Sequence, residues 1–195
     1  MMPIMPTLTS RRELTHDRIL DVAARAIRRA GYDGVGLASI MKEAGLTHGG
    51  FYAHFASRNA LLAAATQCAG RDTGAILVER LRQAQAEGTS PFSALVHTYL
   101  ADAEIENAEC GCVVAALACE IPRQAEEVAI AARARVLGLV DLVRRTLPAH
   151  VDPAQAQVVT ATLVGTLQLA RTLPGKAGKA WLANVRASLI QQYDA

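Results

Sequence analysis

A run of small residues, Thr47-His48-Gly49-Gly50, has the composition needed at the leading end of a DNA-reading helix. In a helix-turn-helix motif this end enters the major groove, where small side chains let the backbone approach the base edges. Two adjacent glycines cost about 1 kcal/mol each in helix propensity relative to alanine. A short helix that carries both therefore indicates close approach to another molecule.

The residues that follow divide the same short helix into two faces. Tyr52 and His54 can donate hydrogen bonds to phosphate oxygens, and Arg58, at the start of the next helix, adds a cation. Phe51 and Phe55 are four residues apart, so they share a face and are expected to pack against the first helix. One face is predicted to anchor the helix and the other to contact DNA.

Three predicted helices position this segment, and together they have the outline of a helix-turn-helix. They are expected over residues 15–30, 37–44 and 48–55. Residues suited to cap or terminate helices mark their ends: Thr15, Gly31, Thr47 and Ser57. A longer helix is predicted to begin at Arg58.

The remainder of the chain reads as successive helices separated by breakers. Breaks are predicted around residues 88–91, 107–111, 148–153 and 172–175, with a break or kink at Pro122. No strand pattern or internal repeat is evident. We therefore predict an all-α protein: a flexible basic arm over 1–14 that includes Arg11 and Arg12, a three-helix helix-turn-helix domain over 15–60, and a bundle of about six helices over 61–195 for ligand binding and dimerisation.

Composition and charge agree with a DNA-binding head on a neutral body. Residues 1–60 hold eight Lys and Arg against five Asp and Glu, whereas residues 61–195 hold twelve against thirteen. The longest apolar runs, such as residues 113–118, are far shorter than the roughly 20 residues that cross a bilayer. Residues 1–10 have no basic residue and no apolar core, unlike a signal peptide. We therefore expect a cytoplasmic protein with reduced cysteines.

The stretch from Gly31 to Leu61 resembles the DNA-binding signature of the TetR (tetracycline-repressor-like) family of bacterial transcription regulators, most clearly in the segment GLTHGGFYAHFASR. The resemblance implies a homodimeric repressor that binds a palindromic operator and is released by a small molecule in the C-terminal bundle. It places the start of the recognition helix and the phosphate contacts at the following positions: Thr47, His48, Gly49, Gly50, Tyr52, His54 and Arg58.

Two positions depart from the family pattern. Gly36 stands where the family commonly has a Ser or Thr that caps the second helix and contacts a phosphate, so Ser39 becomes the candidate hydroxyl. His48 stands where the family commonly has Lys, which would make operator affinity mildly dependent on pH because His titrates near neutrality.

The cysteines Cys110, Cys112 and Cys119 form a second group with possible chemistry. If residues 112–120 are helical, Cys112 and Cys119 lie two turns apart, about 10 Å between Cα atoms and too far for a disulfide. One interpretation makes Cys112 and Cys119 small buried residues, as a family pattern Gly-Cys-x-x-Ala-Ala-Leu-Ala suggests for Cys112. The other makes the group a thiol sensor, with Cys110 in an exposed loop as its most reactive member.

Candidate ligand and dimer contacts lie further along the chain. Polar or adaptable residues in the middle helices are candidates for the ligand pocket: His97, Tyr99, Cys112, Glu120 and Arg123. Residues at helical spacing in the last two helices predict either a dimer interface or an intramolecular core face: Val158, Thr162, Gly165, Leu169, Trp181, Val185, Ser188 and Leu189. The family resemblance favours the dimer interface.

The leading hypothesis is a ligand-responsive DNA-binding regulator. A redox- or electrophile-sensing repressor acting through Cys110, Cys112 and Cys119 is the alternative. A small helical enzyme is a remote third, because we find no nucleophile–base pair, phosphate loop or metal-ligand spacing. We therefore expect no metal and no cofactor.

Overall fold

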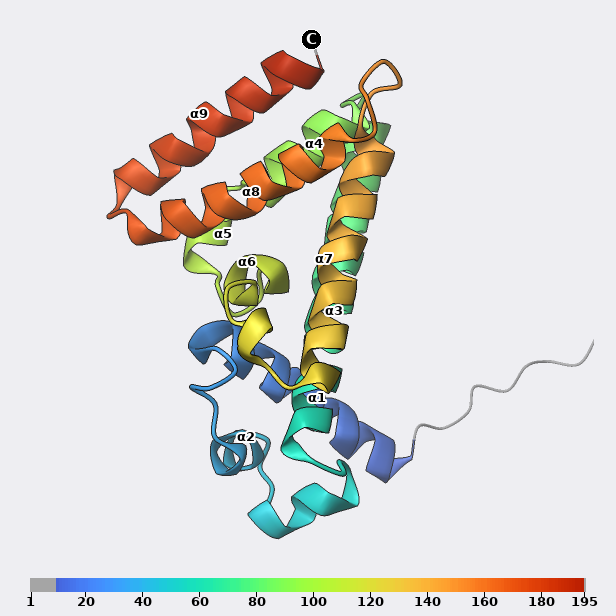
Figure 1. Cartoon of the computed structure of the whole chain (residues 1–195), viewed down its shortest axis with the longest axis vertical. Helices are drawn as coiled ribbons and strands as arrows, with labels where there is room; N and C mark the ends of the chain where they lie inside the picture. Colours follow the sequence, from blue (N-terminus) through green and yellow to red (C-terminus); the bar gives the residue numbers. More distant parts are fainter. Residues whose placement is uncertain (1–9, 195) are drawn as a thin grey trace, which may run out of the picture.

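The head of the molecule is a three-helix unit at one end of its long axis (Figure 1). A computed structural model describes residues 10–194, and within that range every regular element is a helix. The head comprises α1 (Arg11–Ala30), α2 (Leu37–Glu43), the short 3-10 helix η1 (His48–Ala53) and the first turns of α3 (Arg58–Ala86). The predicted all-α class and N-terminal helix-turn-helix are confirmed.

Helix α1 begins earlier than predicted, at Arg11 instead of beyond Thr15. Ser10 forms a capping box with Glu13: its hydroxyl accepts from the Glu13 amide at 3.2 Å, and its amide donates to the Glu13 carboxylate at 2.6 Å. Thr15 caps nothing and donates its hydroxyl to the Arg11 carbonyl. Arg11 and Arg12 therefore belong to a helix and not to a flexible arm, and residues 1–9 lie outside the described residues.

The core of the head includes the inner face of α1 and both phenylalanines of the η1 region. Ile19, Ala23 and Ile27 on α1 are completely buried. Phe51 is also fully buried, and its ring stacks on that of Phe55 with 5.8 Å between centroids. The expected inward packing of both phenylalanines is confirmed.

Helix α3 crosses the boundary that the sequence placed at residue 60. Its N-cap is Ser57, as predicted, whose hydroxyl accepts from the Ala60 amide at 3.0 Å. The helix then continues for 29 residues into the body. Glycines 70 and 74 do not interrupt it, since single glycines lower helix stability without ending a helix. The head and the body are therefore joined by continuous helix and not by a linker.

The body contains the remaining helices, and its predicted breaks are confirmed. In chain order they are α4 (Pro91–Tyr99), α5 (Ala103–Glu106), α6 (Val113–Leu117), η2 (Ile121–Arg123), α7 (Glu126–Thr146), α8 (Gln155–Thr172) and α9 (Lys176–Tyr193). Helices α3 and α7 run side by side, and α8 and α9 pair at the end of the molecule far from the head (Figure 1). Between residues 10 and 194, no helix has the length and apolar character to cross a membrane.

Candidate nucleic-acid interface and ligand cavity

The η1 segment presents a polar outer face over an aromatic anchor. Thr47, His48 and Gly49 are exposed and Tyr52 is 70% exposed, whereas the intervening Phe51 is completely buried. Phe51 thus fixes the segment to the head while its neighbours face solvent. The segment is a six-residue 3-10 helix, shorter than the eight-residue helix predicted.

The two glycines of η1 have no packing reason to be glycine. A Cβ atom at Gly49 would meet nothing within 4 Å, and one at Gly50 would make only an ordinary contact with Thr47 at 3.7 Å. Neither glycine has a positive φ. Their cost in helix propensity is therefore not offset inside the protein, which supports close approach by an external surface such as a DNA groove.

Arg58 makes contacts within the head through one nitrogen of its guanidinium. Its Nη2 donates to the Tyr32 carbonyl at 2.6 Å and to the Val35 carbonyl at 3.2 Å. These bonds hold the turn between α1 and α2, whose carbonyls have no helical partner. Arg58 is therefore a half-buried clamp on the turn, and its role as a phosphate contact stays a prediction.

Two other predicted DNA contacts lie in α2 and directly after η1. Ser39 is exposed in α2, and His54 is half-buried just after η1. His54 lies 6.1 Å from the His16 ring, which stacks on Phe55 at 4.5 Å. The Nδ1 atom of His54 is buried without a hydrogen-bond partner among residues 10–194. Arg12 donates to the Ala53 carbonyl at 2.9 Å, which ties the start of α1 to the end of η1.

Glu120 lies at the junction of head and body and not at a ligand pocket. Its Oε2 accepts from the Tyr32 amide at 2.8 Å, just after the end of α1. Gly31 precedes this amide with φ of +76°, and a Cβ atom there would collide with the Glu120 carboxylate. Tyr32 also shares a hydrogen bond of 2.9 Å with Thr66 on α3. The segment after α6 is therefore bonded directly to the head.

The segment before α6 is bonded to the head as well. The buried Arg28 of α1 lies within 3.5 Å of the Gly111 carbonyl, and the Thr73 hydroxyl donates to the same carbonyl at 3.2 Å. Burial lowers the pKa of Arg28, and the neighbouring Cys110 and Asp72 oppose that shift. Helix α6 is therefore connected to the head at both of its ends.

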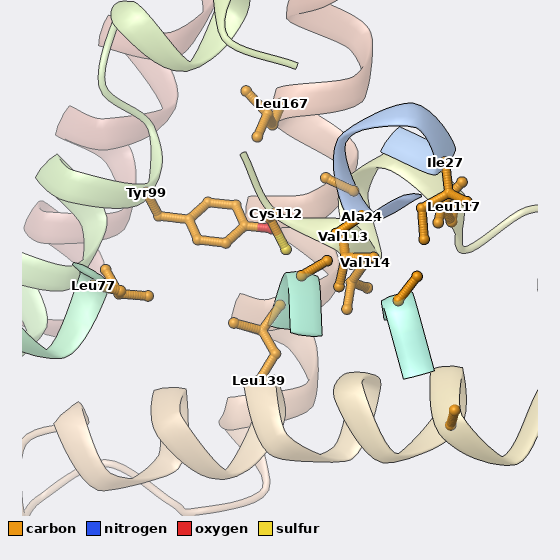
Figure 2. Packing of buried hydrophobic residues seen from close by; sticks show 14 of the residues in the cluster. Ala24, Ile27, Leu77, Tyr99, Cys112, Val113, Val114, Leu117, Leu139 and Leu167 are labelled. Atoms are coloured by element: carbon orange, nitrogen blue, oxygen red, sulfur yellow. The ribbon is translucent and has the colours of Figure 1, made fainter. Parts of the chain in front are cut away.

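A cavity of about 330 Å³ lies in the body between α3, α4, α6 and α7. Of the predicted ligand residues, Tyr99 and Cys112 line it, with the Tyr99 side chain pointing toward Cys112 (Figure 2). His97 and Arg123 are exposed and lie away from it, because they fall on the outer sides of α4 and η2. The sequence analysis missed most of the lining: Gly70, Arg71, Thr73, Gly74, Leu77, Val78, Val113, Val114, Arg135, Gly138, Leu139, Leu142 and Arg145.

The four cysteines are all free thiols in the structure. Cys112 is buried, as predicted, but Cys119 is exposed because α6 ends at Leu117 and leaves Cys119 in a turn. Cys110 is exposed, as the sensor interpretation requires. Burial, together with the nearby Asp72 carboxylate, raises the pKa of Cys68. In the part of the chain that the structure describes, no cluster of His, Cys, Asp and Glu could hold a metal ion.

Helices α8 and α9 have one buried and one exposed apolar face. Val159, Leu163 and Leu167 are buried in the protomer. Three of the predicted interface residues are large, apolar and exposed: Val158 at 53%, Leu169 at 53% and Trp181 at 43%. Leu189 is buried inside the protomer, so its assignment to the interface was wrong. The remaining candidates are half-buried or exposed: Thr162, Gly165, Val185 and Ser188.

Comparison with known proteins connects this geometry to a family. Residues 19–65 match the sequence model for "Bacterial regulatory proteins, tetR family". No curated protein sequence matches the chain.

Solved structures resemble nearly the whole fold. A TetR-family transcriptional regulator from Agrobacterium tumefaciens is 22% identical, with a TM-score of 0.75 over 93% of this chain and 98% of that one. A TetR regulator from Chloroflexus aurantiacus is 23% identical, with a TM-score of 0.75 over 93% and 96%. The reduced form of Escherichia coli NemR is 21% identical, with a TM-score of 0.72 over 90% and 94%. The N-terminal domain of this protein therefore belongs to the tetR family of bacterial regulatory proteins, and the whole chain has the fold of TetR-family transcriptional regulators.

Proposed function

We propose that this protein is a homodimeric transcriptional repressor that binds a palindromic operator and leaves it when a small molecule occupies the body cavity. The observation that carries the proposal is the outer face of η1, with open glycines at 49 and 50 over the buried Phe51, in a domain of the tetR family. A protein that works on chromosomal DNA acts in the cytoplasm of a bacterium. The remote enzyme alternative gains no supporting feature from the described residues.

The exposed apolar residues of α8 and α9 support the dimer. Val158, Leu169 and Trp181 form a face that a second copy of the chain would cover. Two heads related by a two-fold axis would read half-sites in successive major grooves, roughly 34 Å apart. The operator is therefore expected to be a palindrome.

Helix α6 is the element that connects the cavity with the head. Cys112, Val113 and Val114 line the cavity. The flanking Gly111 and Glu120 are bonded to α1 and to the turn that follows it. If α6 can take two positions, each would give the head a different orientation. A ligand that binds one of these states more tightly than the other would shift the population toward it, by no more than the difference in binding free energy.

The proposal is tested by fluorescence anisotropy with the full-length protein and labelled duplexes. We expect at least 1,000-fold tighter binding to the region upstream of the protein's own gene than to a random duplex at the same salt concentration, as for specific DNA binders generally. The salt concentration must be held fixed, because phosphate contacts make affinity depend on it. Equal affinity for both duplexes would contradict the proposal.

Replacing Glu120 tests the connection between α6 and the head. Glu120→Ala leaves the Tyr32 amide without its 2.8 Å acceptor, which is expected to lower the free energy of unfolding by about 1–3 kcal/mol. Glu120→Gln retains an acceptor oxygen and is expected to recover most of that loss. Urea unfolding measures both, and Arg123→Ala, an exposed neighbour, is the matched control. An Ala variant as stable as the wild type would show that this bond does not hold the junction.

A second candidate function is release from DNA by oxidation, favoured by the exposure of Cys110 beside Gly111, whose carbonyl lies against Arg28. The Cys110 thiolate would attack hydrogen peroxide, giving a sulfenic acid at Cys110 and releasing hydroxide, which is protonated to water. We expect peroxide to weaken DNA binding of the wild type but not of a variant with Cys110, Cys112 and Cys119 replaced by Ser. Cys68→Ser is the control, because Cys68 is half-buried and its pKa is raised. Retained peroxide response in the triple variant would exclude this function.

A further inference from the structure

The wall of the body cavity carries positive charge and no negative charge. Arg71 of α3 and Arg135 and Arg145 of α7 line it, whereas no Asp or Glu does. Arg145 forms an ion pair with Asp141. Among residues 10–194, no carboxylate pairs with Arg71 or Arg135. Arg135 is half-buried, so its charge without a counter-ion gives the cavity wall a positive potential, whereas the exposed Arg71 is screened more by solvent.

Two buried donors at this wall have no acceptor. The Nε atom of Arg135 is buried and makes no hydrogen bond among the described residues. The Tyr99 hydroxyl is buried and has no hydrogen-bond partner of normal geometry, and the Cys112 thiol, a weak hydrogen-bonding group, lies beside it (Figure 2). Burial raises the pKa of Tyr99 well above its usual value, so the hydroxyl remains a donor at neutral pH. An unsatisfied buried donor destabilises the protein, and an acceptor entering the cavity would remove that cost.

The cavity also stays open because two of the glycines that line it have no side chain to fill it. Gly74 of α3 and Gly138 of α7 line it inside helices, and a Cβ atom at either would meet nothing within 4 Å. Each glycine destabilises a helix interior relative to alanine. Gly70 differs, because a Cβ atom there would collide with the stem of Arg135. Gly70 therefore makes room for the arginine, and the other two make room for an occupant.

The rest of the wall is mainly apolar. The aliphatic lining residues come from α3, α6 and α7: Leu77, Val78, Val113, Val114, Leu139 and Leu142. A cavity of about 150 Å³ holds a benzene molecule, and ligand sites begin at about 300 Å³. The 330 Å³ cavity therefore suits a small ligand with an apolar body larger than one aromatic ring.

We propose that the effector is a small amphipathic anion whose acidic group pairs with Arg135 and whose apolar body fills the space beside Gly74 and Gly138. An ionised oxyanion, such as a carboxylate, supplies the missing acceptor for arginine in a charge-assisted bond. This proposal rests on the cavity being the effector site of the proposed repressor.

Isothermal titration calorimetry on the full-length protein tests the charge with three matched probes: decanoate, decanol and decylammonium, all below their aggregation concentrations. We expect decanoate to bind at least 10-fold more tightly than decanol, and decylammonium to bind least. Arg135→Gln should weaken decanoate at least 10-fold and change decanol less than 3-fold. Arg133→Gln is the control, because Arg133 is exposed on the same helix and paired with Glu126.

A second variant tests the location without removing the charge. Gly74→Leu fills the cavity from α3 and is expected to reduce binding of decanoate and decanol alike, while circular dichroism confirms the fold. The proposal is overturned if decanol or decylammonium binds as tightly as decanoate, if Arg135→Gln spares decanoate, or if no probe binds. Anisotropy with operator DNA is measured separately. If decanoate binds without releasing DNA, the repressor mechanism is contradicted but the anion site is not. If only neutral ligands release DNA, the anion site is contradicted but the repressor mechanism is not.

Discussion

Phe51→Ala is expected to lower the free energy of unfolding by about 3–5 kcal/mol, as large-to-small changes at fully buried aromatic positions do. Phe51 has no exposed surface and stacks on Phe55, so its removal leaves a cavity under η1. Since domains of this size are stable by only about 5–15 kcal/mol, the head would lose much of its folded population and its DNA binding. Urea unfolding and anisotropy measure the two effects.

The adjacent residue provides the matched control for this experiment. Tyr52→Phe keeps the exposed ring, which lies edge-on to Phe51 at 5.1 Å, and removes only the hydroxyl. We expect a change in stability within about 0.5 kcal/mol and a loss of DNA affinity of about 2–10-fold, the value of one hydrogen bond. If both variants changed stability equally, the assignment of an anchoring face and a DNA-facing face would be wrong.

Charges introduced into the exposed face of α8 and α9 are expected to dissociate the dimer. In a Leu169→Glu, Trp181→Glu double variant, two carboxylates per chain would be buried against an apolar partner, which strongly disfavours association. Loss of the second head removes the gain from simultaneous binding, so affinity for a full palindrome should fall by about 100–10,000-fold. Sedimentation velocity and anisotropy with full-site and half-site duplexes measure these changes.

Leu137→Glu serves as the matched substitution for the dimer variant. Leu137 is 69% exposed on α7, outside the predicted interface. We expect a dimer with unchanged affinity for the full palindrome. A monomeric Leu137→Glu variant would move the interface to α7, and a double variant that remains a dimer would exclude the α8 and α9 face.

The order of the helices and the anchoring of η1 could be predicted from sequence, because they depend on local signals. Gly31, Pro148 and the Phe51–Phe55 spacing each act within a few residues of chain. The start of α1 also depends on a local signal, since Ser10 and Glu13 have the spacing of a capping box. The earlier start changes Arg11 and Arg12 from arm residues to helix residues.

The structural roles of Arg58 and Glu120 could not be predicted, because they depend on contacts between distant residues. Arg58 bonds carbonyls 23 and 26 positions away, and Glu120 bonds an amide 88 positions away. Neither partner can be identified without the packing of α1 against α3 and α6. One sequence signal could have indicated the cavity: Gly74 and Gly138 lie inside otherwise regular helices. A glycine inside a helix that no unusual backbone conformation requires indicates a position where the fold leaves space for a ligand.

The continuity of α3 from head to body also limits how the two parts can be exchanged between proteins. Each residue of an α-helix adds about 100° of rotation and 1.5 Å of rise, so one residue inserted after Ser57 and before the body contacts would turn the head by about a quarter of a revolution. Seven inserted residues would nearly restore the rotation but lift the head by about 10 Å. Chimeras that join this head to another body must therefore cross over within α3 in helical register. A cut at residue 60 would also remove Thr66, which bonds Tyr32 of the head.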